Sequence, residues 1–77
     1  MNILVELTYI GWDSTIQRSG SFPVNPKKFH ENSEAAAAEI AIKWIREIYR
    51  HEHISRLISV KFNRDHDITG LVRSKLY

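Results

Sequence analysis

Apolar and polar residues follow a helical period from Ser33 to His53, the longest regular pattern in the chain. Apolar side chains recur there at three- and four-residue steps, which predicts an amphipathic helix. The apolar arc covers about 200°, against roughly 100° for an ordinary core-facing stripe. We expect the sheet to cover the part of the arc centred on Ala37, Ala41, Trp44 and Ile48. The margin of the arc, at Ile42 and Tyr49, is then expected to meet a partner.

A period of two, typical of strands with one buried face, occurs on both sides of this helix. Residues 2–10 alternate in this way and predict a first strand. A second strand is expected within Thr15–Val24, at an edge of the sheet because Pro23 cannot donate to a ladder. A third strand is expected at Arg56–Asn63. Its inward residues are expected to be Ile58, Val60 and Phe62.

The remaining segments show weaker patterns. Lys27 to Glu31 is expected to be a loop or an irregular helical turn, and residues 63–66 a turn. From Asp67 onward the apolar residues fit helical spacing, with Asp67 as a suitable N-terminal cap. A strand in this tail would place Gly70 among the apolar positions of one face, so we favour a short helix.

Connection rules convert these elements into a fold. The first two strands form a hairpin, and a right-handed crossover through the long helix places the third strand beside the first. The predicted fold is α+β, a two-layer ββαβ(α) sandwich. In it, a three-stranded antiparallel/mixed sheet of order 2-1-3 packs against one long helix, followed by a short C-terminal helix. Residues 1–77 are expected to form a single domain. This plan recurs in unrelated small bacterial and phage-encoded proteins, so it indicates no function by itself.

Length and composition restrict the class of protein. A chain of 77 residues buries only about 60% of its unfolded surface, so its stability is marginal. It contains no cysteine, which excludes disulfides and is compatible with a reducing compartment. No apolar run approaches the length of a membrane span, and the start lacks the basic region of a signal peptide. We expect a cytoplasmic protein that does not insert into membranes.

Charge gives a second functional hypothesis. The formal net charge is +2, but residues 55–77 contain five basic and two acidic residues. A nucleic-acid-binding regulator could use this basic third, although such proteins usually carry a denser basic stripe. The alternative is a solvated basic face that aids solubility. The residues concerned are Arg56, Lys61, Arg64, Arg73 and Lys75.

One short motif resembles a metal site. His51-Glu52-His53 places two imidazoles two residues apart, at the expected end of the long helix. A usable zinc site needs three or four ligands, and His30 or His66 would have to arrive from elsewhere. We expect these histidines to be exposed and favoured by the helix dipole, and we expect no metal.

Catalytic and cofactor motifs are not evident in the sequence. The serines lack a nucleophile elbow, and the three glycines are dispersed and form no phosphate-binding loop. Asp65-His66-Asp67 could orient an imidazole, but such runs are usually solvated turns. We therefore expect no enzyme and no cofactor.

The first functional hypothesis is a small non-enzymatic protein-interaction module. It would act as a homodimer, or as an inhibitor or adaptor of a larger protein, including proteins of phage or mobile-element type. Trp12 follows Gly11 in the first turn, where it either projects as a binding anchor or folds back over the core. The expected partner-binding residues are Trp12, Ile42, Arg46 and Tyr49.

Overall fold

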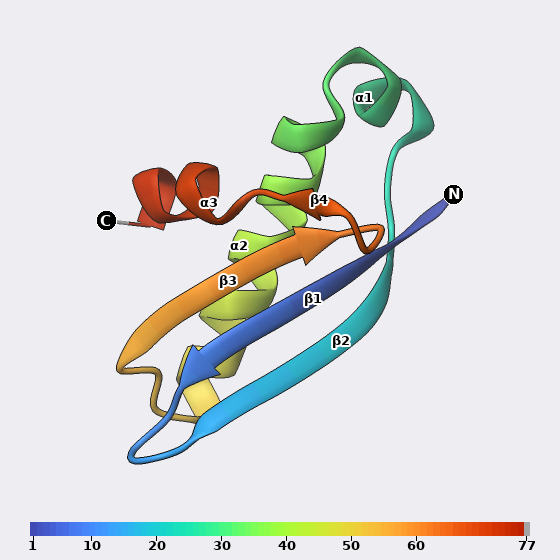
Figure 1. Cartoon of the computed structure of the whole chain (residues 1–77). Helices are drawn as coiled ribbons and strands as arrows, with labels where there is room; N and C mark the ends of the chain where they lie inside the picture. The colour runs from blue at the N-terminus through green and yellow to red at the C-terminus, as the bar shows by residue number, and fades with distance from the viewer. Residues whose placement is uncertain (77) are drawn as a thin grey trace.

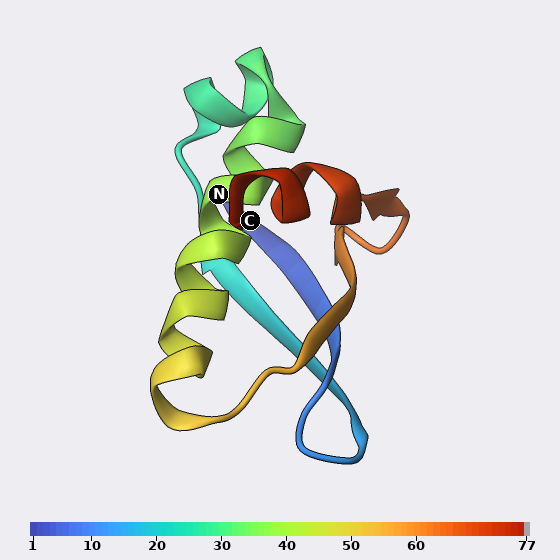
Figure 2. The same ribbon diagram turned by 90° about the vertical axis from the view of Figure 1, so that its left-hand side faces the viewer.

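An antiparallel sheet with helices on one face forms the fold, as the computed structural model shows for residues 1–76 (Figures 1 and 2). The predicted α+β sandwich is confirmed. The elements are β1 (Asn2–Ile10), β2 (Thr15–Pro23), α1 (Pro26–Glu31), α2 (Ser33–His51), β3 (Arg56–Phe62), β4 (His66–Asp67) and α3 (Thr69–Leu76).

The strand order is β2-β1-β3-β4, and every neighbouring pair is antiparallel. The predicted order 2-1-3 and the edge position of the proline strand are confirmed. The fourth strand was not predicted, because two residues are too short to show a period. It forms because Asn63 and Arg64 adopt positive φ angles of 49° and 71°, which reverse the chain after β3.

The inward face of β3 differs from the prediction at one residue. Thr8 pairs with Ser59 and Tyr9 with Leu57, so Ile58 is an extra residue in the ladder. Such a bulge shifts the alternation by one position. Leu57 is therefore buried and Ile58 is 38% exposed. The expectation that Ile58 faces the core is wrong.

Two asparagines set the boundaries of the first helices. The Asn25 side chain accepts from the backbone N–H groups of Lys27 and Lys28, and Pro26 occupies the first turn of α1. The segment predicted as a loop or an irregular turn is thus a short helix. Asn32 ends α1 and caps α2 by accepting from Ala35 at 3.1 Å. Within residues 1–76, no helix is long and apolar enough to span a membrane.

The core lies between the sheet and α2, but α2 is rotated relative to the sequence expectation. Its buried residues centre on Ala41 and Ile45, about 50° from the expected centre, at about 100° per residue. Ile42 is only 9% exposed, whereas Trp44 is half-buried at the margin of the core. The expected exposure of Ile42 is wrong, because α3 contacts α2 and places Val72 in the same core.

The tail is helical, as predicted, and a small hydrogen-bond network anchors its start. The carboxylate of Asp67 accepts from the hydroxyl and the backbone N–H of Thr69. These two hydrogen bonds lower the pKa of Asp67 below its ordinary value, and the bond from the hydroxyl has the larger effect. The Thr69 hydroxyl oxygen in turn accepts from the backbone N–H of Val60 at 2.9 Å. This network fixes α3 to the end of β3.

Candidate functional site

The outer side of β2 is a long open edge of the sheet. β2 pairs with β1 over all nine of its residues, from Thr15 opposite Ile10 to Pro23 opposite Asn2. Among residues 1–76, no other strand pairs with β2. Figure 1 shows β2 along the margin of the sheet, with its outer side away from α2 and α3.

The direction of the β2 backbone groups follows from the hydrogen bonds of β1. The carbonyl oxygens of Leu4 and Ile10 accept from backbone N–H groups on the β3 side, both at 2.8 Å. Because these groups alternate along a strand, the odd-numbered residues of β1 face β2. Their partners in β2 are Ile16, Arg18, Gly20 and Phe22. The N–H and C=O groups of Gln17, Ser19 and Ser21 therefore face outward, and we call these three residues the β2 edge.

The side chains of β2 divide between the two faces of the sheet. Gln17, Ser19 and Ser21 are exposed and carry no charge, and by strand alternation they lie on the face without helices. Ile16 and Phe22 are half-buried and pack against the core. β2 thus has polar side chains on the face without helices and apolar side chains on the helix face.

An apolar groove lies between β2 and α2. The rings of Phe22 and Trp44 contact each other at a centroid distance of 4.8 Å and an interplanar angle of 57°. A Cβ on Gly20 would lie 3.3 Å from the Trp44 ring, so the absent side chain lets the indole approach the strand closely. We call this groove the Trp44 groove. Its lining residues are Phe22, Pro23, Ile40, Lys43, Trp44 and Glu47.

A polar cluster joins β2 to the end of α2. Arg18 Nε donates to the hydroxyl of Tyr9 at 2.9 Å, and its guanidinium forms an ion pair with Glu52. The hydrogen bond to Tyr9, followed by the charge of Glu52, raises the pKa of Arg18 above its ordinary value. Sequence reasoning missed this cluster. The available signal was an arginine at an inward position of β2, between Ile16 and Phe22.

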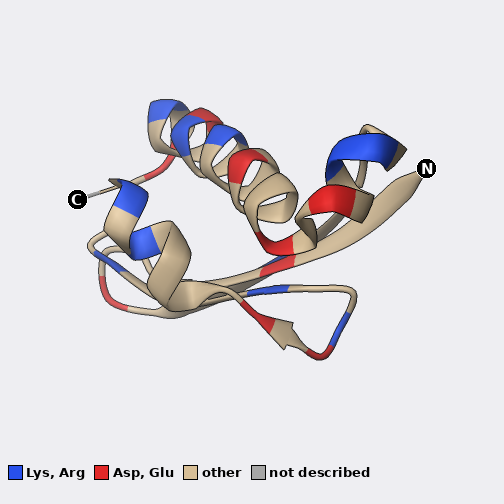
Figure 3. Cartoon of the chain, turned by 90° about the horizontal axis from the view of Figure 1, so that it is seen from above, with Lys and Arg blue, Asp and Glu red and all other residues tan. Residues whose placement is uncertain are grey.

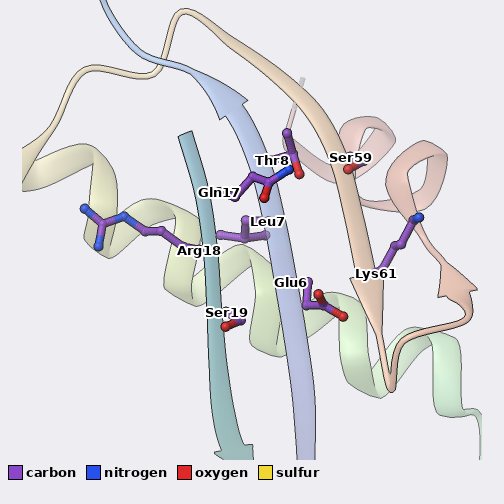
Figure 4. Close-up of a pocket in the computed structure, with 8 residues that line it drawn as sticks. All are labelled: Glu6, Leu7, Thr8, Gln17, Arg18, Ser19, Ser59 and Lys61. Carbon is purple, nitrogen blue, oxygen red and sulfur yellow. The ribbon is translucent and has the colours of Figure 1, made fainter. Parts of the chain in front are cut away.

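The face of the sheet without helices carries a shallow polar hollow (Figure 4). Glu6 and Lys61 are direct cross-strand partners there. In Figure 4 the side chain of Arg18 extends away from the other labelled groups. The hydroxyl and amide groups of this hollow can form hydrogen bonds, but its lining includes no histidine to activate a hydroxyl. The lining residues are Glu6, Leu7, Thr8, Gln17, Arg18, Ser19, Ser59 and Lys61.

The structure separates the partner-binding residues expected from the sequence. Trp12 is 82% exposed and stacks on His53, at a centroid distance of 4.0 Å. Tyr49 is 50% exposed, and its hydroxyl donates to the carbonyl oxygen of Ile54 at 2.8 Å. Arg46 is exposed on the charged side of α2. Ile42 lies in the core and is therefore not part of the candidate partner surface.

The histidines do not converge on one site. His30 lies in α1, His51 ends α2, His53 stacks on Trp12, and His66 stacks on Phe62. Glu52, between His51 and His53, pairs with Arg18 instead. Over residues 1–76, no group of three or more histidine and acidic side chains is placed to hold a metal ion.

The basic residues of the C-terminal third are dispersed. Arg56 lies at the start of β3, Lys61 on the sheet face and Arg64 in the turn before β4. Arg73 donates to the carbonyl oxygen of Leu57 and is partly occupied by that contact. Lys75 lies on α3. Figure 3 shows basic residues on several elements, with acidic residues among them along α2.

Comparison with known proteins gives no further guide. No protein-family model, curated protein or solved structure matches this chain at a significant level.

Proposed function

We propose that this chain is a non-enzymatic protein-interaction module that binds a partner strand along the β2 edge. The observation that carries the proposal is a nine-residue edge strand whose outward backbone groups adjoin an apolar groove. A bound strand would take its affinity from main-chain hydrogen bonds. Its alternate side chains would enter the Trp44 groove and give specificity, as in strand addition generally.

The chemistry of β2 supports this proposal. Proteins usually shield an edge strand with charges, proline or short length, because an open edge invites pairing. Here the side chains of Gln17, Ser19 and Ser21 are uncharged, and Pro23 lies at the very end of the strand. The one charged residue of β2, Arg18, is paired with Glu52 on the helix side. The edge is therefore weakly shielded.

Other functions have less support from the same geometry. A catalytic role for the polar hollow has little support. Its Glu6 and Lys61 lie directly opposite each other, an arrangement that serves to stabilise a strand pair. For nucleic acid, a continuous basic surface is needed, and Arg73 is engaged with a backbone carbonyl. We therefore propose a protein partner.

Ser19→Pro is the test of this proposal, with Ser19→Ala as its matched control. Proline removes one outward N–H without breaking a bond to β1, whereas alanine removes only the side chain and keeps that N–H. We expect both variants to fold, by circular dichroism and thermal melting. Ser19→Pro should lose self-association and partner capture from the source cell, and Ser19→Ala should keep them.

The proposal fails if the Ser19→Pro chain binds its partner as well as the parent does. It also fails if the parent neither self-associates nor captures a protein. A salt-dependent mobility shift with DNA or RNA would instead favour a nucleic-acid-binding regulator, since phosphate contacts weaken steeply as salt rises.

A further inference from the structure

We infer that the strand bound by the β2 edge is β2 of a second copy of this chain, antiparallel and with Ser19 on the two-fold axis. This inference rests on the proposed function and names its partner. Three independent features of the described residues favour a second copy over an unrelated strand. They are the backbone register, the side chains that this register opposes, and the charges beside the Trp44 groove.

The backbone register is self-complementary about Ser19. With the axis at this residue, Ser19 faces the partner's Ser19, and Gln17 faces the partner's Ser21. All these residues point their N–H and C=O groups outward, so each pair exchanges both hydrogen bonds. Pro23, which has no N–H, lies opposite Thr15 at the end of the ladder, where a missing donor costs least. All nine residues of β2 are paired in this register.

The side chains on the helix face also fit this register. Arg18 lies opposite the partner's Gly20, which is covered by the partner's Trp44 ring, so the guanidinium would meet an indole and not another charge. Ile16 lies opposite the partner's Phe22, and both are half-buried apolar residues. Direct cross-strand apolar pairs of this kind stabilise a sheet.

The neighbouring registers are less favourable. Moving the axis to Arg18 would place two arginines directly opposite each other, and like charges in that position are destabilising. Moving it to Gly20 would place Pro23 opposite the partner's Gln17 and shorten the ladder within β2 from nine residues to seven. The axis at Ser19 avoids both penalties.

The helix layer supplies complementary charges. A two-fold axis perpendicular to the sheet makes the two α2 helices antiparallel neighbours on the same face. Trp44 lies over Gly20, next to the axis, so the two Trp44 grooves meet there. Lys43 and Glu47 are one helical turn apart on the rim of the groove. In antiparallel helices, Lys43 faces the partner's Glu47 and Glu47 faces the partner's Lys43.

This arrangement has the composition of a protein interface. An apolar centre of Phe22 and Trp44 would be surrounded by a charged rim, as in ordinary interfaces. Burial of the groove would also add apolar contact to a chain that by itself buries only about 60% of its unfolded surface.

The first test is the molar mass in solution, by size-exclusion chromatography with light scattering over a concentration series. We expect twice the chain mass of 9.0 kDa. Lys43→Glu should weaken the dimer by about tenfold, because two attractive rim contacts become repulsive. Adding Glu47→Lys to the same chain should restore it. Lys75→Glu, the same change of charge on α3 at the β3 side of the sheet, is the control and should leave the dimer unchanged.

The second test maps the register by cysteine cross-linking in this cysteine-free chain. Directly opposed residues of a hydrogen-bonded strand pair have Cα atoms about 5.5 Å apart, within the range of a disulfide. Under mild oxidation, Ser19→Cys should form a covalent dimer. Ser21→Cys and Ser59→Cys alone should not, and a mixture of Gln17→Cys and Ser21→Cys chains should cross-link with each other.

The outcomes separate this inference from the proposed function. A monomer at every concentration, or cross-linking that ignores position, overturns the dimer. If such a monomer still captures another protein and loses it with Ser19→Pro, the interaction module stands with a different partner. If Ser19→Pro changes nothing in either assay, both fail.

Discussion

The guanidinium of Arg18 donates a hydrogen bond to the phenol oxygen of Tyr9 at 2.9 Å, and so joins an exposed residue of β2 to a fully buried residue of β1. The same guanidinium pairs with Glu52 just beyond α2. The cluster therefore connects the edge strand, the central strand and the end of the long helix. It also satisfies the polar atom of an otherwise apolar side chain in the core.

Tyr9→Phe is expected to lower the free energy of unfolding by about 1–3 kcal/mol, because the hydroxyl accepts from Arg18 at 2.9 Å and donates to Glu52 at 3.4 Å and both partners are charged. Glu52→Gln should cost less, since the Arg18–Glu52 pair is substantially exposed and screened by solvent. Urea unfolding at low and high salt measures both. The Tyr9→Phe effect should be independent of salt, and the Glu52→Gln effect should shrink. No loss in Tyr9→Phe would show that the hydroxyl contributes nothing.

Ile42→Ala is expected to destabilise the fold by about 2–4 kcal/mol, as for other buried isoleucines. Tyr49→Phe, on the same side of α2, should cost only about 1 kcal/mol, because its ring is half exposed and one hydrogen bond to Ile54 is lost. Chemical denaturation of the two variants in parallel tests the rotation of α2. A tolerated Ile42→Ala would mean that α3 does not cover this position.

Trp12→Ala is expected to change the free energy of unfolding by no more than about 0.5 kcal/mol, as is usual for exposed positions. The indole contacts His53 by stacking but lies outside the core. Trp44→Ala is the matched comparison and should cost clearly more, because Trp44 packs against Phe22 and the core. Equal melting temperatures for the two variants would contradict this assignment.

The contribution of Asp67 to stability is expected to depend on pH. Its pKa in the fold is lowered below the ordinary value of 3.8 by the hydrogen bonds from Thr69. The folded state therefore favours the ionised carboxylate, and this contribution is fully present above the ordinary pKa. It is lost as the pH falls through the lower pKa of the folded state.

The measurement is the difference in urea midpoint between the parent and Asp67→Asn, from neutral pH down to below pH 3.8. The difference should be largest near neutrality and should shrink at the acid end. Asp65→Asn removes a carboxylate two residues away and controls for overall charge. A parent-to-variant difference that grows as the pH falls would reverse the assigned direction.

The sequence by itself determined the elements whose signals are local. Alternation in residues 2–10 specified a half-buried strand, and the helical period from Ser33 onward specified α2. Pro23 marked β2 as an edge strand, since proline cannot donate to a ladder. These features require only the chain neighbours of each residue, so periodicity and backbone chemistry were sufficient.

Only the tertiary structure decided which element covers each apolar face. Periodicity locates a stripe on α2 but not its neighbours, so α3 placed Ile42 in the core and left Trp44 at the margin. The bulge that turned Ile58 outward depends on pairing with β1. Arg18, Tyr9 and Glu52 met because strand pairing and the helix end brought distant positions together. Each of these outcomes depends on contacts between segments far apart in the chain, which a local pattern does not encode.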